Sequence, residues 1–355
     1  MSTYKRLSIK SRIKDYSVSF IDNLKDGFDP EPEKKYFLII DQNVKNLYER
    51  ELEGFLKKYP FLVIEATEER KTLDYVRVVI RQLIDSDVKR GYALVAIGGG
   101  IIQDITAFIA SILYRGVDWV FYPTTLLSQS DSCIGSKTSI NVDEYKNQVG
   151  NFYPPCSIFL NTNFLKTLSY ADIRSGLGEI IKVHLLDGKW AMKYMQETYD
   201  RSLNDPTLME ELIFRSLRIK KRIIEKDEFD TGIRNIMNYG HTFGHALESI
   251  THYKLCHGQA ITVGMDISNF LSCKFGYISE EMYSQMREIL LKNWPDYDLK
   301  SLDLSQFFKS LAKDKKNTGS KITAILTEGP GRMKKSSFAL DDKVRDTLSS
   351  YFKNL

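Results

Sequence analysis

The chain has 355 residues, of which 43% are hydrophobic and 27% are charged, a composition typical of a folded globular protein. That length exceeds what one hydrophobic core usually supports, so we expect two domains. The net charge of +4 is too small to indicate a nucleic-acid partner, and no apolar run approaches the length of a membrane span. The first residues lack the apolar region of a secretory signal, and four scattered cysteines without CxxC spacing predict free thiols, so we expect a cytoplasmic protein.

The first part of the chain alternates short apolar runs with helix-like segments. Residues 6–21 alternate like an antiparallel pair of strands. Five further runs read as strands, at 35–41, 61–66, 92–98, 119–123 and 157–161. Because these runs are almost continuously apolar, we expect strands buried on both faces, in a parallel sheet covered by helices.

Helical spacing dominates from about Tyr170 onward. Apolar residues recur with a period near 3.6 in segments 171–186, 209–228 and 234–250. Residues 321–338 read instead as a hairpin around a Gly-Pro-Gly turn.

These patterns predict the domain organisation. We expect an α/β, Rossmann-like, N-terminal domain over residues 1–165 and a mostly α-helical C-terminal domain over residues 166–355.

Polar residues form one stripe of segment 234–250. Read as a continuous helix, the segment places Arg234, Asn238, His241 and His245 within an arc of about 60°. A stripe of that spacing is normally apolar and faces a core. A polar stripe therefore predicts a ligand opposite it.

Four of the five histidines lie within residues 241–257, and three of them are candidate ligands. His241 and His245 have the spacing of two metal ligands on one helix face, and His257 precedes another helix-like segment. Glu179, among apolar residues with Lys182 one turn further on, is the candidate carboxylate. Nitrogen and oxygen ligands without cysteine are those of a catalytic zinc; capping or core histidines are the alternative.

Three consecutive glycines, Gly98, Gly99 and Gly100, end a predicted strand and precede a helix. Backbone without side chains can approach an anion there, and the helix N-terminus offers free N–H groups. The sequence is neither a P-loop nor GxGxxG, so a tight turn alone is the alternative. Asp41, with Asn43 just beyond it, ends an earlier strand and adds a carboxylate for a ribose hydroxyl, which favours a dinucleotide.

The stretch 130–155 between two predicted strands is rich in glycine, serine and asparagine. It contains Asp131, Lys137, Lys146 and Asn147. Loops that follow strands of an α/β sheet often bind ligands. Solvated surface lysines are the alternative, unless the ligand carries a phosphate.

Several ordered motifs resemble those of 3-dehydroquinate synthase and its sugar-phosphate cyclase relatives. They are "GGGIIQD", "GSKTSIN", "YKNQVGNFYPP", "LGEIIK", "RNIMNYGHTFGHALE", "HGQA" and "DKKN". The resemblance runs from roughly Asp41 to Lys316. It implies an NAD-binding α/β domain followed by a helical metal-binding domain, usually in a homodimer.

The resemblance also implies roles for individual residues. The implied ligands of a zinc (or cobalt) ion are Glu179, His241 and His257, which moves His245 from the ligand set to the substrate site. The implied catalytic and substrate-contacting residues are Asp131, Lys137, Lys146, Asn147, Lys182, Lys220, Arg234, Asn238, His245, Lys315 and Lys316. Arg115 matches an arginine that reaches the neighbouring subunit's site. The implied NAD contacts are Asp41, Asn43, Glu68, Lys71, Gly98, Gly99, Gly100, Asp104, Thr124, Thr125 and Thr167, together with Lys137 and Lys146.

The implied reaction converts 3-deoxy-D-arabino-heptulosonate 7-phosphate into 3-dehydroquinate and phosphate, in the shikimate pathway of aromatic amino acid biosynthesis. NAD takes up a hydride and returns it within one turnover, and several cations offset the charges of a small-molecule sugar phosphate. The alternatives are sister cyclases of the 2-epi-5-epi-valiolone, 2-deoxy-scyllo-inosose or amino-dehydroquinate type. A metal-dependent polyol dehydrogenase has no use for phosphate-binding lysines, and a non-catalytic binding protein would be expected to have lost part of the ligand set.

Three residues depart from the usual motifs of that family. Ser136 and Ser139 replace glycines of GGKTGIN, and Gln259 replaces the glutamate of HGEA. We expect the serines to alter the shape of a substrate loop. Loss of the carboxylate is expected to weaken the support of a metal-bound histidine.

Overall fold

The computed structural model describes residues 5–27, 34–143, 145–313 and 321–355. The chain forms two compact units, one comprising Met1–Leu168 with Lys220–Phe229 and the other Ser169–Ile219 with Asp230–Leu355. Residues 220–229 thus cluster with the first unit, although they follow a long stretch of the second. Within the described part of the chain, no helix is both long and apolar enough to cross a bilayer.

A seven-stranded sheet in the order β1-β2-β9-β6-β5-β3-β4 forms the centre of the first unit. Its strands are β1 (Arg6–Ile9), β2 (Tyr16–Phe20), β3 (Lys35–Asp41), β4 (Phe61–Ile64), β5 (Tyr92–Gly98), β6 (Asp118–Pro123) and β9 (Ser157–Leu160). Neighbouring strands are parallel except for the antiparallel β1–β2 pair. The predicted parallel sheet and its antiparallel start are therefore confirmed.

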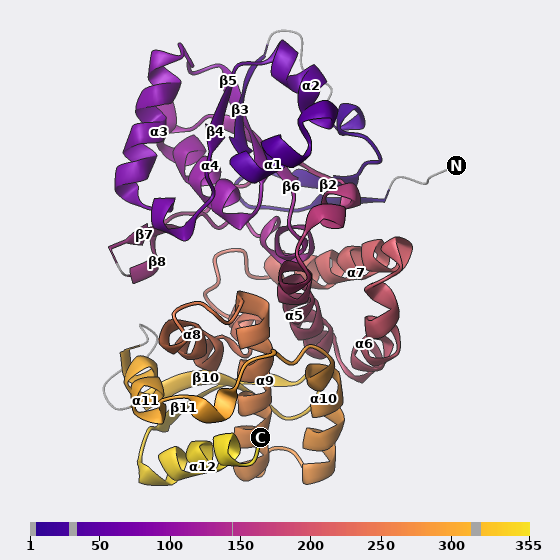
Figure 1. Ribbon diagram of the computed structural model, residues 1–355, viewed down its shortest axis with the longest axis vertical. Coiled ribbons are helices and arrows are strands. Elements are labelled where there is room, and N and C mark those ends of the chain that lie inside the picture. Colours follow the sequence, from indigo (N-terminus) through magenta and orange to yellow (C-terminus); the bar gives the residue numbers. More distant parts are fainter. Residues whose placement is uncertain (1–4, 28–33, 144, 314–320) are drawn as a thin grey trace. The chain divides into compact units, whose positions relative to one another are not determined.

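Helices cover both faces of this sheet. They are α1 (Gln42–Leu47), α2 (Glu49–Lys58), α3 (Leu73–Asp85) and α4 (Gly100–Ile112). Figure 1 shows α1 and α2 on one side of the strands and α3 and α4 on the other. A separate short hairpin, β7 (Ile140–Val142) and β8 (Tyr145–Val149), lies within the stretch that the sequence predicts as a loop.

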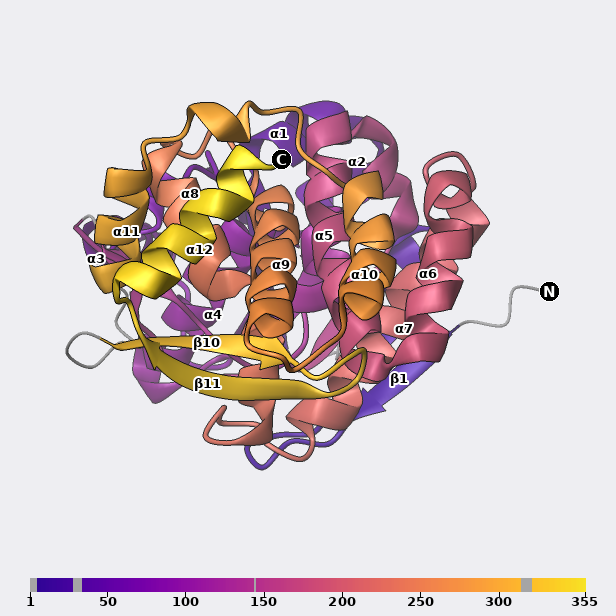
Figure 2. The same cartoon turned by 90° about the horizontal axis from the view of Figure 1, so that it is seen from below.

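The second unit consists mostly of helices, as expected. They are α5 (Tyr170–Asp187), α6 (Lys189–Ser202), α7 (Pro206–Ile224), α8 (His241–Ile250), α9 (His257–Lys274), α10 (Glu280–Lys292), α11 (Leu304–Lys313) and α12 (Asp342–Lys353), of which α7 belongs to the first unit from Lys220 onward. The predicted hairpin is present as β10 (Lys321–Thr327) and β11 (Met333–Ala339). Figure 2 shows α9 in the middle, with α8 and α12 on one side and α5 and α10 on the other.

Helix α9 crosses α5 and α8 at very short range. A Cβ atom on Gly258 of α9 would lie 1.7 Å from the carbonyl oxygen of Ser175 on α5, and one on Gly178 would lie 2.0 Å from the carbonyl oxygen of Gly258. On the other side, a Cβ on Gly264 would lie 2.1 Å from the carbonyl oxygen of Gly240, which precedes α8. Only glycine fits at these positions, and the crossings bring residues of α5 and α8 to the start of α9.

The helix expected over residues 234–250 is interrupted, so the prediction of one continuous stripe is wrong. Ile233–Asn238 forms a short 3-10 helix, and α8 begins only at His241. Between them Gly240 has φ +81°, and a Cβ there would lie 2.7 Å from the carbonyl oxygen of Ile261. The left-handed turn that lets the chain pass close to α9 ends the first helix.

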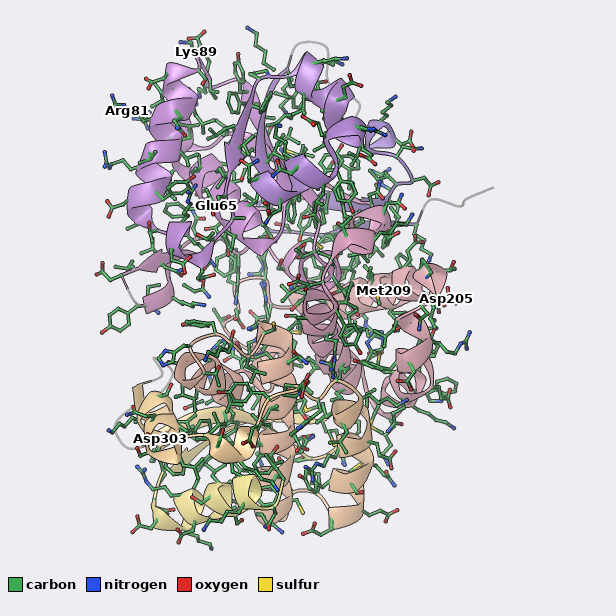
Figure 3. All side chains as sticks on the ribbon, viewed as in Figure 1. Glu65, Arg81, Lys89, Asp205, Met209 and Asp303 are labelled. Atoms are coloured by element: carbon green, nitrogen blue, oxygen red, sulfur yellow. The ribbon has the colours of Figure 1, made fainter. Side chains whose placement is uncertain are left out.

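Charged side chains on the outside of the protein need no functional explanation. Arg81 and Lys89, for example, lie on the outer side of the first unit (Figure 3). The ion pair of Arg81 with Asp85 joins side chains that are 80% and 69% exposed, and such pairs contribute little to stability. Buried charged groups are the informative ones.

We predict that Gly258→Ala destabilises the protein, because its new methyl group would overlap the Ser175 carbonyl group. Overpacking of this kind costs about 1–3 kcal/mol or more. Thermal unfolding measures the effect. Gly54→Ala in α2 is the control, since a Cβ there meets nothing within 4 Å and alanine favours helix; an equal loss in both variants would contradict the prediction.

We predict that the protein loses stability in mild acid because His184 is buried. The side chain is 1% exposed on α5, its Nδ1 lies 2.7 Å from the carbonyl oxygen of Ile180, and burial lowers its pKa from 6.5 to about 4. As the pH falls below about 6.5, the unfolded chain takes up a proton before the folded chain does, so stability falls between about pH 6.5 and pH 4 by up to roughly 3 kcal/mol. Urea unfolding at pH 7 and pH 4.5 measures this, and in His184→Gln the pH dependence should be smaller; an unchanged dependence would remove His184 as its source.

Candidate functional site

Glu179, His241 and His257 in the second unit form a candidate metal site. One ligand atom from each lies within 4.8 Å of the others. Nε2 of His241 and Nε2 of His257 lie 3.7 and 3.4 Å from Oε1 of Glu179. A tetrahedral ion held at about 2.1 Å separates its ligand atoms by roughly 3.4 Å, so the set fits one divalent metal such as zinc.

Lys182 holds the other oxygen of the candidate carboxylate. Its Nζ donates to Oε2 of Glu179, and the two side chains are 2% and 1% exposed. Burial of an isolated carboxylate is costly, and the adjacent ammonium offsets part of that cost. The pairing leaves Oε1 directed toward the two imidazoles.

Glu248 on α8 supports the third ligand and is not among the residues predicted from the sequence. Its Oε1 lies 3.2 Å from Nδ1 of His257, which directs Nε2 of that ring toward Glu179. The signal was available, because Glu248 follows His241 by two helical turns and shares its face. The carboxylate beside His257 is thus present despite glutamine at position 259.

Burial by itself lowers the pKa of His257, but the carboxylates of Glu248 and Glu179 raise it to about 10. With no metal bound, the pocket therefore holds a proton on His257 at neutral pH. A metal ion and that proton compete for the same electron pair.

The remaining predicted residues of this unit lie before or along α8. The His245 ring is exposed and its centroid lies 5.2 Å from that of His241 and 5.9 Å from that of His257. An alternative ligand set of His245, Glu248 and His257 also lies within 4.8 Å. Arg234 is 4% exposed on the preceding 3-10 helix, which ends at Asn238.

The glycine loop of the first unit joins β5 to α4. A Cβ on Gly98 would lie 2.5 Å from Ile102, and one on Gly99 would lie 2.9 Å from the methyl group of Thr125. The N–H of Thr124 donates to the carbonyl oxygen of Gly98 over 3.0 Å. The bare backbone at the N-terminus of α4 is suited to an anion such as a pyrophosphate.

Asp41 and Thr167 have local hydrogen-bond partners. Oδ1 of Asp41 accepts from the N–H of Asn43 over 2.8 Å and caps α1, and burial raises the pKa of this carboxyl. The hydroxyl of Thr167 lies 2.8 Å from that of Tyr48.

Lys71 is the centre of a polar network in the same unit. The residue is 6% exposed, and its Nζ lies 2.6 Å from Oδ2 of Asp104 and donates to Oδ1 of Asn147 over 2.8 Å. Burial raises the pKa of Asp104, and the Lys71 ammonium opposes that shift. Lys146 reaches the edge of the network, with Nζ 3.6 Å from Oε1 of Glu68.

Asn141 on β7 connects this network and is not among the residues predicted from the sequence. Its side chain donates to Oε1 of Glu68 over 2.8 Å and accepts from the N–H of Asn147 over 2.9 Å. Its own N–H donates to the carbonyl oxygen of Lys71 over 2.8 Å.

Three more predicted cations occupy other places in the first unit. Lys220 lies with its Nζ 2.5 Å from Oδ1 of Asp131 and also donates to the backbone carbonyl of that residue. Lys137 is exposed between buried neighbours. Arg115 follows α4, whose 13 residues extend for about 20 Å, so it lies at the opposite end of that helix from the glycine loop. The predicted contacts of Lys315 and Lys316 lie outside the described residues.

Comparisons with known proteins identify the family. Residues 61–175 match the profile described as 3-dehydroquinate synthase N-terminal, and residues 176–317 match the one described as 3-dehydroquinate synthase C-terminal. The 3-dehydroquinate synthase of Alkaliphilus metalliredigens is 36% identical over 306 residues, which cover 84% of this chain and 85% of that protein. The chain belongs to the 3-dehydroquinate synthase family. Another 3-dehydroquinate synthase, from Campylobacter fetus, is 35% identical over 321 residues, covering 90% of this chain and 91% of that protein.

Solved structures of sugar-phosphate cyclases share the fold of this 3-dehydroquinate synthase family member. A 2-deoxy-scyllo-inosose synthase complexed with carbaglucose-6-phosphate, NAD+ and Co2+ aligns with a TM-score of 0.85 at 24% identity, over 99% of this chain and 100% of that one. A 2-epi-5-epi-valiolone synthase from Streptomyces hygroscopicus with NAD+ and Zn2+ aligns with a TM-score of 0.84 at 22% identity, over 98% and 99%. The predicted fold class is confirmed.

We predict that Glu248→Gln weakens metal binding about 10–100-fold, because His257 loses the carboxylate that orients its ring. Competition with a chelator measures the affinity without reference to activity. Glu280→Gln on α10, where the native side chain is 73% exposed, is the matched control. Equal affinities in the two variants would show that Glu248 does not support the site.

Proposed function

We propose that the chain is a 3-dehydroquinate synthase, a carbon–oxygen lyase that eliminates phosphate from 3-deoxy-D-arabino-heptulosonate 7-phosphate to give 3-dehydroquinate. The observation that carries the proposal is the buried carboxylate of Glu179 beside two imidazole Nε2 atoms, in a chain of this family. A polyol dehydrogenase is the less favoured candidate, because its substrate carries no phosphate and it has no use for the lysines around the predicted substrate loop.

A zinc ion, held by Glu179, His241 and His257, would act as a Lewis acid toward substrate hydroxyls. Lys182 orients the Glu179 carboxylate and offsets its charge, and Glu248 holds the His257 ring. These residues preorganise the site, so that little rearrangement is needed when the substrate binds.

NAD would accept a hydride from the substrate and return it within the same turnover. The N-terminus of α4 at Gly99 is suited to its pyrophosphate, and Asp41 at the end of β3 to a ribose hydroxyl. Lys71 and Asp104 shape the neighbouring polar wall.

The cationic residues would bind the anionic groups of the substrate. Lys137, Lys146 and Lys220 in the first unit, and Arg234 in the second, offset the charge of a phosphate and a carboxylate that lose water. Lys220 and Arg234 suit a carboxylate-bearing substrate. They favour 3-dehydroquinate synthase over a sister cyclase whose sugar phosphate lacks that group.

A homodimer is part of the proposal, with Arg115 of one subunit reaching the site of the other. Ile84 near the end of α3 and Ile112 at the end of α4 are 50% and 45% exposed, and Arg115 follows α4. Burial of these two apolar side chains in a subunit interface would contribute to association.

The purified protein, supplied with NAD, zinc and the seven-carbon keto-acid phosphate, should release inorganic phosphate with no net accumulation of NADH. A coupled phosphate assay and absorbance at the nicotinamide band measure the two products. Glucose 6-phosphate and sedoheptulose 7-phosphate are the comparison substrates. Phosphate release from one of those alone would assign a sister cyclase, and NADH accumulation would assign a dehydrogenase.

A further inference from the structure

Ser136 has a backbone conformation that is costly for any residue with a side chain. It is 7% exposed, lies between the π-helical turn Ser128–Ser132 and strand β7, and has φ +64°. In this left-handed region a Cβ atom crowds the following carbonyl group, whereas glycine enters it freely. A serine here calls for a compensating interaction.

That interaction is a hydrogen bond to a buried carboxylate. The hydroxyl of Ser136 donates to Oε1 of Glu228 over 3.2 Å. Glu228 is itself 7% exposed, and it also accepts from the hydroxyl of Ser11 over 2.6 Å and from the N–H of Arg12 over 2.7 Å. Charge-assisted hydrogen bonds are stronger than neutral ones, so the Glu228 carboxylate is a fixed anchor for the serine.

The backbone around Ser136 is fixed on both sides. The N–H of Gly135 donates to the hydroxyl of Tyr16 over 3.0 Å, and the carbonyl oxygen of Ser136 accepts from the N–H of Tyr153 over 2.6 Å. The N–H of Thr138 donates to the carbonyl oxygen of Asn151 over 2.9 Å.

Between these fixed residues Lys137 alone is exposed. Ser136 and Thr138 are buried, and the backbone of Lys137 forms a bridge with Phe152. The position from which the lysine side chain extends is therefore set by the conformation of Ser136.

One segment holds this loop at two points. Residues 220–229 supply both Lys220, whose Nζ lies 2.5 Å from Oδ1 of Asp131, and Glu228, which accepts from Ser136. All of these residues belong to the first unit.

We propose that Ser136 and Glu228 are a pair of positioning residues, which hold residues 135–138 so that the Lys137 ammonium meets an anionic group of the substrate. The pair acts through Lys137 and does not itself touch the substrate. This inference rests on the proposed function only in naming the anion that Lys137 binds.

Two substitutions at one position separate the hydroxyl from the backbone strain. Ser136→Ala removes the hydrogen bond and keeps the strain, whereas Ser136→Gly removes both. We expect Ser136→Ala to lower the melting temperature by about 2–4 °C and Ser136→Gly to lower it less. Ser86→Ala, at the exposed end of α3, is the control for an ordinary serine.

Cleavage by trypsin after Lys137, quantified by mass spectrometry, reports the order of the loop and needs no substrate. We expect Ser136→Ala to be cleaved about tenfold faster than the wild type, with Ser136→Gly intermediate. In Glu228→Gln the additional effect of Ser136→Ala should shrink, because the two residues act as one pair.

With the seven-carbon substrate, kcat/KM of Ser136→Ala should fall about tenfold, mainly through KM, while the metal affinity stays unchanged. The inference is overturned if Ser136→Gly exceeds the wild type in stability and in resistance to trypsin, or if Ser136→Ala equals the wild type in both. If the wild type does not turn over this substrate, the proposed function fails, while the melting and trypsin measurements still decide the role of the pair.

Discussion

Helix α9 approaches α5 and α8 so closely that backbone carbonyl groups fill the space where side chains would begin. Gly258 and Gly178 make one crossing possible, and Gly264 and Gly240 the other. The first crossing sets Glu179 beside His257, which opens α9, and the second sets His241 beside both. The candidate metal site therefore depends on the absence of side chains at these glycines as well as on the three ligands.

The strands that the sequence predicted well are buried on both faces, and such strands accept few residue types other than apolar ones. β3 and β5 have the bounds that the sequence predicted, 35–41 and 92–98, since the interior of a parallel sheet accepts mainly apolar residues. The prediction of one continuous helix over segment 234–250 was wrong at Gly240. Helical periodicity in the sequence does not reveal a left-handed turn that the close approach of a neighbouring helix requires. The β7–β8 hairpin was missed because its strands are short and lie in a stretch rich in glycine, serine and asparagine. Its pairing serves the network around Lys71.

Some residues of the candidate site could be predicted from the sequence, and others could not. Glu179 and the histidines are unusual residues in their apolar or helical contexts, so they could be found. Glu248 shares a helix face with His241, but that signal is weak, because a glutamate on a helix is ordinary until its distance to His257 is known. Asn141 and Glu228 likewise gain meaning only from partners far away in sequence. The substitution at Ser136 was visible in the sequence, but its left-handed backbone and its bond to Glu228 were not.

The path of the chain between its two units restricts how this protein could be divided. The polypeptide leaves the first unit after Leu168, returns to it at Lys220 and leaves again after Phe229. A single break near residue 168 would place Lys220 and Glu228 on the wrong fragment, and Asp131 and Ser136 would lose their partners. Chimaeras that recombine halves of related enzymes would accordingly need to exchange residues 220–229 together with the N-terminal half, because Lys220 and Glu228 contact the loop in that half.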